Sequence, residues 1–131
     1  MEFYCTYQFK REFERLLKNN SYAEFEKDMI DFLKSSLDEV RNAIRIGGSD
    51  ERPFLKKRIA GRSGYRVYYL FIIIDGRVYF SFVHPKTGSK GADNIKKAAV
   101  KPLIADVVNA IAGGTCFKVC ISECGSQIRF I

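Results

Sequence analysis

The sequence predicts an α+β fold in which an N-terminal helical hairpin packs on an antiparallel β-sheet meander, followed by a C-terminal helix and a short β extension. Apolar residues recur at helical spacing in the first third of the chain, whereas β-branched and aromatic residues dominate the middle. Asp75-Gly76, a dipeptide that favours a type I′ turn, lies between two of the middle runs. The 131 residues, 47% of them hydrophobic, suit one domain over 1–131 with 113–131 as the extension.

The first third of the chain predicts a short strand and two helices. Alternation over 2–6 is typical of a strand, and apolar residues at helical spacing predict a helix over 8–18. Ser21-Tyr22-Ala23-Glu24 matches a capping box, so a second helix is expected to begin there. Its apolar stripe continues to Ile44, and Gly47-Gly48 ends it.

The middle of the chain predicts the meander. Strands are expected over 54–60, 65–74 and 77–84, because these runs are rich in β-branched and aromatic residues. A turn at 61–64 joins the first two strands, and the Asp75-Gly76 turn joins the second to the third.

The last third of the chain predicts a helix and two short strands. A basic loop over 85–92 precedes a helix from Ile95 onward, capped by Asp93 or Asn94 and restarted or kinked at Pro102. Gly113-Gly114 stops this helix. The two strands of the extension are expected over 115–122 and 127–131.

The net charge is +7, and the positive charge is concentrated in the second part of the chain. Residues 1–51 hold 8 Lys and Arg against 11 Asp and Glu, whereas residues 52–131 hold 14 against 4. This asymmetry points to a polyanionic partner such as nucleic acid, although an acidic protein would also fit it. The sequence shows no run long enough for a membrane helix and no secretory signal, so a cytoplasmic protein without membrane contact is expected.

The four cysteines are expected to be free thiols, because cytosolic reductants keep such residues reduced. Cys116, Cys120 and Cys124 repeat every fourth residue, which separates neighbours on a strand by about 13 Å. That spacing is too wide for one metal ion. A zinc site would require the strand to bend and Cys5 to supply a fourth ligand, so no metal site is expected.

The cations of the middle strands form the candidate site. The strand period of two puts Lys56 and Arg58 on one face of their strand, and Arg66 shares a face of the next strand with Tyr68. If the strands pair as a meander, one sheet face gathers Lys56, Arg58, Arg66, His84 and Lys86. Such a cluster suits a scissile phosphate, and Tyr68 is the first candidate for stacking a base. The alternative is a positively charged sheet face that is exposed to solvent and has no binding role. In addition, a lone histidine is more often structural than catalytic.

A series of short stretches follows one order along the chain. A helix reading FKREFERLLK at 9–18 precedes a basic strand at 56–60, the GRSGYRV turn and strand at 61–67, and the Asp75-Gly76 hairpin. Lys86 and Asp93-Asn94-Ile95 come next. In this order and spacing the stretches resemble RelE/ParE-superfamily toxins of type II toxin–antitoxin systems, closest to the RelE/HigB-like branch. The resemblance covers roughly residues 3–112.

The resemblance implies a small basic toxin that enters the ribosomal A site and cleaves messenger RNA, without a metal or other cofactor, and that a cognate antitoxin protein neutralises. The family's chemistry is attack of a ribose 2′-hydroxyl on the adjacent phosphate. Carried over by position, Lys56 or His84 would act as the base. Arg58 and Arg66 would stabilise the phosphate, and Lys86 would serve as the acid or as a phosphate anchor. Further candidate RNA-binding residues are Lys57, Arg62, Tyr68 and Lys90.

Two other functions fit the same sequence. Some members of the superfamily poison DNA gyrase instead of cutting RNA, so a non-enzymatic, ParE-like gyrase inhibitor is one alternative. A catalytically inactive module that binds nucleic acid or a protein partner is the other. Residues 113–131 extend beyond the family's common ending, and they are expected to add a sheet edge or a partner-binding strand.

Overall fold

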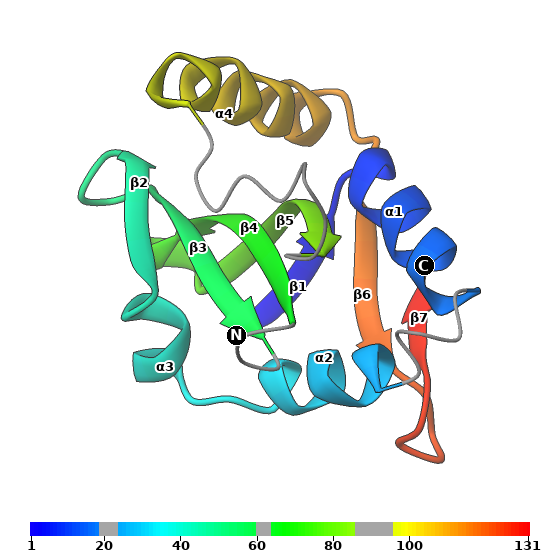
Figure 1. The fold of residues 1–131 in the computed structure, drawn as a ribbon. Coiled ribbons are helices and arrows are strands. Elements are labelled where there is room, and N and C mark those ends of the chain that lie inside the picture. Colours follow the sequence, from blue (N-terminus) through cyan, green and yellow to red (C-terminus); the bar gives the residue numbers. More distant parts are fainter. Residues whose placement is uncertain (19–23, 60–63, 86–95) are drawn as a thin grey trace.

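The computed structural model describes residues 1–18, 24–59, 64–85 and 96–131, and within these it places seven strands in one sheet (Figure 1). The strands are β1 (Glu2–Cys5), β2 (Ile44–Gly48), β3 (Pro53–Ile59), β4 (Tyr65–Ile72), β5 (Arg77–Pro85), β6 (Phe117–Ile121) and β7 (Ile128–Phe130). The helices are α1 (Tyr7–Leu17), α2 (Phe25–Leu33), α3 (Leu37–Arg41) and α4 (Lys97–Ala112). The strands lie in the order β2-β3-β4-β5-β1-β6-β7.

The pairing of the strands is antiparallel except between β1 and β5, which run parallel. Strands β3, β4 and β5 form the predicted meander at the centre of the sheet. Strand β1 lies between β5 and β6, so the N-terminal strand joins the meander to the β6–β7 hairpin. The alternation over 2–6 predicted this strand but not its position, because pairing between distant segments leaves no mark on local periodicity.

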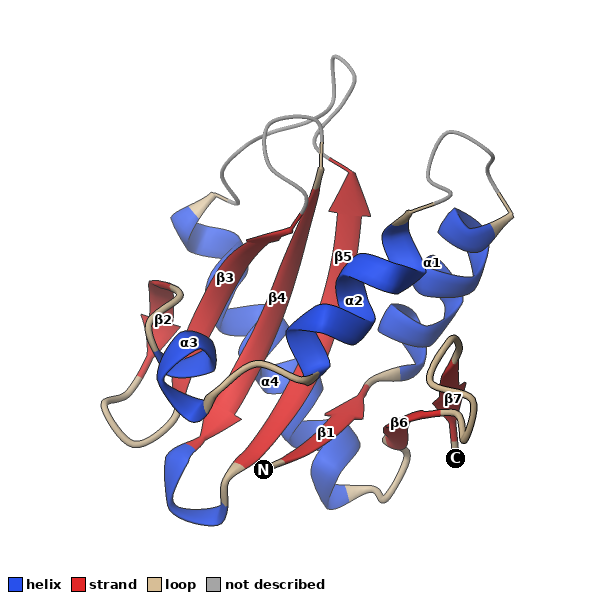
Figure 2. Ribbon diagram, turned by 90° about the horizontal axis from the view of Figure 1, so that it is seen from below, coloured by secondary structure: helices blue, strands red, loops and turns tan. Residues whose placement is uncertain are grey.

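The helices cover both faces of the sheet. Helices α1 and α2 lie on one face and α4 lies on the other, as Figure 2 shows from below. The core under α1 and α2 includes Phe3, Phe9, Phe13, Phe25, Phe32, Val67, Tyr69 and Phe80. The core under α4 includes Phe54, Tyr68, Leu70, Tyr79, Phe82, Val100 and Val107. The predicted α+β class, with helices packed on a largely antiparallel sheet, is therefore confirmed.

Other predictions hold within these elements. All four cysteines have free thiols. Helix α4 includes Pro102 and ends at Ala112, with Gly113 as its C-cap. The capping candidates Asp93 and Asn94 lie outside the described residues, as do Ser21-Tyr22-Ala23. Along the described part of the chain, every helix is too short or too polar to span a bilayer.

The second predicted helix is wrong beyond residue 33. Helix α2 ends at Leu33, α3 begins at Leu37, and Ile44 opens strand β2. The Ser36 hydroxyl accepts a hydrogen bond from the Glu39 backbone N–H at 3.3 Å, so this serine caps a new helix. The apolar spacing continues past Leu33 into α3 and β2, although Leu37 and Ile44 are each 50% exposed, so this spacing marks neither the breaks in the backbone nor the burial of each residue.

The hairpin between β4 and β5 also differs from its prediction. Strand β4 ends at Ile72, and Ile73–Asp75 form a 3-10 turn, so Asp75-Gly76 is not a two-residue type I′ turn. The Ile73 N–H donates to the Glu51 carbonyl oxygen at 3.2 Å, a bond in register with the β3–β4 pairing that extends this pairing beyond the end of β4. Gly76 closes the turn at φ 62° and ψ 35°, a left-handed conformation that favours glycine.

Helix α4 approaches strand β2 at Gly47, and this contact generates a test of the packing. A Cβ built at Gly47 would lie 2.5 Å from Val100 Cγ1, closer than carbon atoms can approach. Val100 is buried, and a β-branched side chain in a helix has essentially one rotamer, so it cannot turn away. We expect Gly47→Ala to lower the free energy of unfolding by about 1–3 kcal/mol, measured by urea denaturation.

The double variant Gly47→Ala/Val100→Ala controls for this cause. Removing the Val100 methyl groups relieves the clash. The double variant should therefore lose less unfolding free energy than the two single variants lose when their losses are added. Additive effects would show that the cost at Gly47 arises elsewhere.

Candidate functional site

Three of the predicted site residues form a row across the central strands. Arg58 of β3 lies opposite Arg66 of β4, and Arg66 lies opposite His84 of β5. Opposite residues share a sheet face and their Cβ atoms lie about 5 Å apart, so the row spans about 10 Å. Lys56 lies one pair further along the same face of β3. We call Lys56, Arg58, Arg66 and His84 the cation row.

A β-bulge puts His84 in this row. The register of β4 and β5 shifts between Tyr68 and Tyr69, which pair with Phe82 and Phe80. Ser81 is therefore an extra residue in β5. Without it, period-two pairing would put Val83 opposite Arg66 and would turn His84 to the other face.

The bulge is supported by the segment between β1 and α1. The Thr6 hydroxyl donates to the Ser81 carbonyl oxygen at 2.8 Å, and the Thr6 N–H donates to the Phe80 carbonyl oxygen at 3.0 Å. The same hydroxyl accepts from the Phe9 N–H at 3.2 Å, which caps α1. Thr6 thus fixes the bulge and the start of the helix together. Sequence reasoning missed both roles, although a threonine between a strand and a helix is a recognisable N-cap signal.

Helix α1 also bonds directly to β5 at Val83, the residue before His84. The Val83 N–H donates to Glu12 Oε1 at 3.3 Å. Burial raises the pKa of the Glu12 carboxyl, and the hydrogen bond from Val83 opposes that rise. The contact ties α1 to β5 directly beside His84.

The cation row is unusually buried for charged residues. Lys56 is 5% exposed and Arg66 is 1% exposed, whereas His84 is half-buried and Arg58 is exposed. Arg66 Nη1 donates to the Tyr65 carbonyl oxygen at 3.3 Å. Two arginines directly opposite each other repel, and the repulsion grows as water is excluded.

Aromatic rings lie beside the row on the same face. Tyr68 stacks on Phe82 with ring centroids 4.3 Å apart, and the His84 ring lies nearly parallel to both at 5.6 and 5.8 Å. This packing orients the imidazole. Tyr68 is fully buried, so its ring packs within the sheet face, and its role in stacking a base stays a prediction.

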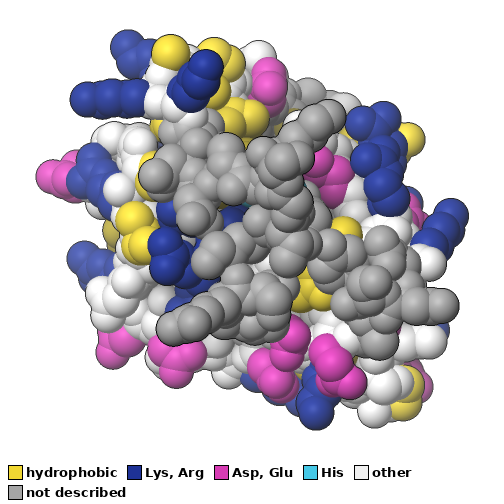
Figure 3. All heavy atoms as spheres, viewed as in Figure 1, with side chains coloured by type: hydrophobic (Ala, Val, Ile, Leu, Met, Phe, Trp, Pro, Cys, Tyr) yellow, Lys and Arg dark blue, Asp and Glu magenta, His cyan; other side chains and the backbone are white. Residues whose placement is uncertain are grey.

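The other predicted residues do not join this arrangement. Lys57 pairs with Val67 and faces the α1 and α2 side. It lines a hollow of about 280 Å³ whose other lining residues include Asp28, Asp31 and Glu39, and also Arg58 of the cation row. Burial raises the pKa of Asp28, and the neighbouring Asp31 adds to the rise. Arg62, Lys86 and Lys90 lie outside the described residues. Figure 3 shows Lys and Arg side chains gathered over β3, below α4.

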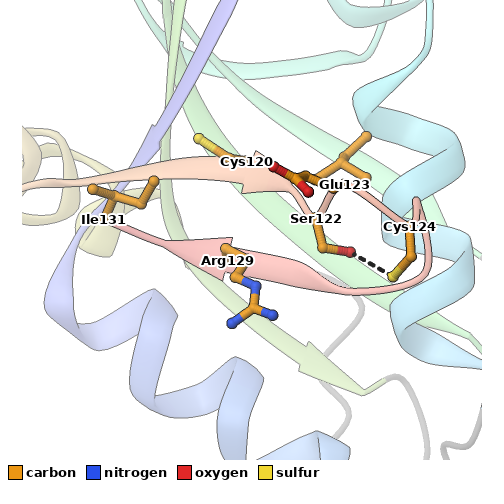
Figure 4. Close-up of a pocket in the computed structure, with 7 residues that line it drawn as sticks. Cys120, Ser122, Glu123, Cys124, Arg129 and Ile131 are labelled. Atoms are coloured by element: carbon orange, nitrogen blue, oxygen red, sulfur yellow. Dashed lines mark hydrogen bonds between the residues drawn. The ribbon is translucent and has the colours of Figure 1, made fainter.

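A second feature lies at the β6–β7 hairpin. A hollow of about 500 Å³ is lined by Cys120, Ile121, Ser122, Glu123, Cys124, Arg129 and Ile131 (Figure 4). Cys124 Sγ lies 3.2 Å from the Ser122 hydroxyl and 2.9 Å from the Ser126 hydroxyl. Hydrogen bonds from these side chains, Ser122 first, lower the pKa of the Cys124 thiol to about 7. Figure 4 shows the Cys120 side chain on β6 and the Cys124 side chain in the turn of the hairpin, apart from each other.

In the portions of the chain that the structure describes, no three His, Cys, Asp or Glu side chains gather closely enough to hold a metal ion. Searches of protein-family models, curated proteins and solved structures found no match to this chain.

The dual role of Thr6 is testable by substitution. Thr6→Val keeps the shape of the side chain but loses the cap of α1 and the bond to Ser81, so it should cost about 1–3 kcal/mol of unfolding free energy. Denaturation measured by circular dichroism checks this. Thr6→Ser keeps the hydroxyl and should lose much less, and equal losses for the two variants would contradict the hydrogen-bonding role.

The reactivity of Cys124 should follow the pH. Because the thiolate is the nucleophile, the rate of alkylation by iodoacetamide should rise with pH through a midpoint of about 7. Mass spectrometry of the peptides separates Cys124 from Cys5, whose burial raises its thiol pKa. The double variant Ser122→Ala/Ser126→Ala should move the midpoint upward. A wild-type midpoint close to that of an ordinary thiol would show that the hydroxyls do not stabilise the thiolate.

Proposed function

We propose that this protein is the toxin of a toxin–antitoxin pair and that it cleaves messenger RNA on the ribosome. The observation that carries the proposal is the cation row, in which Arg58, Arg66 and His84 occupy one line on one sheet face. The resemblance of the sequence to RelE/ParE-superfamily toxins supplies the ribosome and the antitoxin as partners. The strongly positive second part of the chain supports RNA as the substrate class.

The chemistry needs a base, an acid and positive charge. Attack of a ribose 2′-oxygen forms a bond to phosphorus while the bond from phosphorus to the 5′-oxygen breaks. A base accepts the proton of the 2′-hydroxyl, and an acid gives a proton to the leaving 5′-oxygen. Negative charge develops on the phosphate oxygens in the transition state, where fixed cations stabilise it.

The residues of the cation row suit these roles to different degrees. The Arg58 side chain is exposed and can bind phosphate oxygens, whereas Arg66, opposite it on β4, is 1% exposed and would contribute positive charge from within the sheet face. His84 is the better candidate for the base than Lys56, because its half-buried ring reaches solvent whereas Lys56 is 5% exposed. Lys86 is the candidate acid, on the resemblance alone.

Substitutions of the more exposed row residues test the proposal without opening the core. We expect His84→Ala and Arg58→Ala each to lower the rate of transcript cleavage by about 10²-fold or more. Primer extension on ribosome-bound transcripts measures the cleavage. Arg41→Ala removes an exposed charge at the end of α3, away from the row, and should cleave like the wild type.

Different outcomes would overturn different parts of the proposal. Wild-type rates for both row variants would exclude the row as the site. Growth arrest with intact transcripts and reduced DNA supercoiling would assign the protein to the gyrase inhibitors. RNA binding with neither arrest nor cleavage would identify an inactive binding module.

A further inference from the structure

Helix α1 exposes a cationic face directly opposite its buried face. Its apolar side chains Phe9, Phe13 and Leu16 pack into the core. Arg11, Arg15 and Lys18 follow one another at i, i+4 and i+7, and all three are exposed. Residues at this spacing form one stripe, which extends about 10 Å along the helix axis. We call these three residues the α1 triad.

The α1 triad surrounds one hollow. Arg11, Arg15 and Lys18 line a surface depression of about 320 Å³ together with Glu14. The Glu14 carboxylate is paired with Lys10 at 3.0 Å. Between described residues, the ion pairs within 4.0 Å include none of the triad. The hollow therefore has three cations around it, and its single carboxylate is already neutralised by a fourth.

Lys10 is held in place independently of the hollow. Its ammonium group lies over the Phe117 ring at 5.4 Å and over the Phe130 ring at 5.9 Å, both on the β6–β7 hairpin. The C-terminal hairpin thereby fixes the cation that neutralises Glu14, while the Glu12 carboxylate, which interacts with Arg15 and Arg11, offsets part of the positive charge of the triad.

The ordinary reason for cations on a helix explains only part of this arrangement. Positive charge near a helix C-terminus is favourable because it offsets the helix dipole, which accounts for Arg15 and Lys18. Arg11 lies nearer the middle of α1, beyond the range of that effect. Helix dipole compensation also gives no reason for three cations to converge on one depression.

The α1 triad is separate from the cation row. Helix α1 covers the sheet face opposite the row, and the triad points away from that face. In Figure 3 Lys and Arg side chains gather over α1, apart from those over β3. The helix runs alongside β5, since Thr6 bonds to Ser81 and Glu12 bonds to Val83, so its last turns reach the end of the strand that carries His84. A polyanion on the triad would thus lie at the same end of the molecule as the row.

We propose that the α1 triad binds the phosphate backbone of a folded RNA, separately from the RNA strand that is cleaved at the cation row. The choice of RNA as the polyanion rests on the function proposed above. The triad would hold the protein on a structured RNA surface while the row acts on a single strand. A stripe of long, flexible cations suits contacts to phosphates, which carry no base readout, and the exposed Tyr7 lies one turn before Arg11 on the same stripe.

The experiment measures RNA binding in a background that does not cleave. The full chain with His84→Ala is titrated against a fluorescein-labelled RNA hairpin over a range of salt concentrations. We expect Arg11→Gln/Arg15→Gln/Lys18→Gln in this background to reduce the slope of log K against log salt by about 2 to 3, because each lost phosphate contact removes about one counterion. Arg11→Gln alone should reduce it by about 1.

A charge-matched variant provides the control. Lys34→Gln/Arg41→Gln/Lys101→Gln also removes three exposed positive charges, from the C-cap of α2, from α3 and from α4, and should leave the slope near that of the parent. Equal slopes for the triad variant and the control variant would overturn the proposal, since only the total charge would then matter. Loss of binding to phosphatidylserine vesicles without loss of binding to the hairpin would overturn it in favour of a membrane surface.

The test also separates this proposal from the proposed function. Transcript cleavage lost in Arg58→Ala while hairpin binding is kept would support the row and the triad as distinct surfaces. A triad-dependent slope in a chain that never cleaves RNA would keep the triad and exclude the nuclease. If the triad variant still cleaves transcripts and still binds the hairpin, the triad is not an RNA-binding surface, and the proposed nuclease function is unaffected.

Discussion

The extra residue Ser81 in β5 is the constraint on which the candidate site depends. A strand alternates its side chains strictly, so one inserted residue turns every later side chain to the opposite face. In this sheet the insertion brings His84 opposite Arg66, and it keeps Phe80 and Val83 together in the core under α1 and α2. The same shift therefore satisfies the core and completes the row.

Thr6 connects this local irregularity to the rest of the fold. Its hydroxyl joins the bulge to the first turn of α1, and the strand before it joins the meander to the C-terminal hairpin. The direction of α1 along β5 follows from this anchor. As a result, the two cationic surfaces of the molecule lie on opposite sheet faces but share one end of the sheet.

The fold could be predicted where the signal lies within one element. The aromatic and β-branched runs predicted the central strands, and the spacing of apolar residues predicted α1 and α4. An element that buries one face has apolar residues that recur with the period of that element, and this recurrence can be read from the sequence. The break after Leu33 was missed because α2, α3 and β2 contribute to one continuous apolar stripe. Strand β2 exists through its pairing with β3, where Ile44 lies opposite Lys56, and no local pattern encodes that contact.

The sequence by itself determined which residues of the site share a face within one strand, since period two is a local property: Lys56 and Arg58 stay together and Lys57 faces away. The summed charge of residues 1–51 gave no sign of the cationic face of α1, because the acidic residues of α2 and α3 outweigh its cations in the sum. Only the tertiary structure decided that His84 faces Arg66 and that Lys56 is buried. Those relations depend on which residues of neighbouring strands are paired and on the packing of distant segments. A single bulge adds one residue to one strand and so turns every later side chain of that strand to the other face.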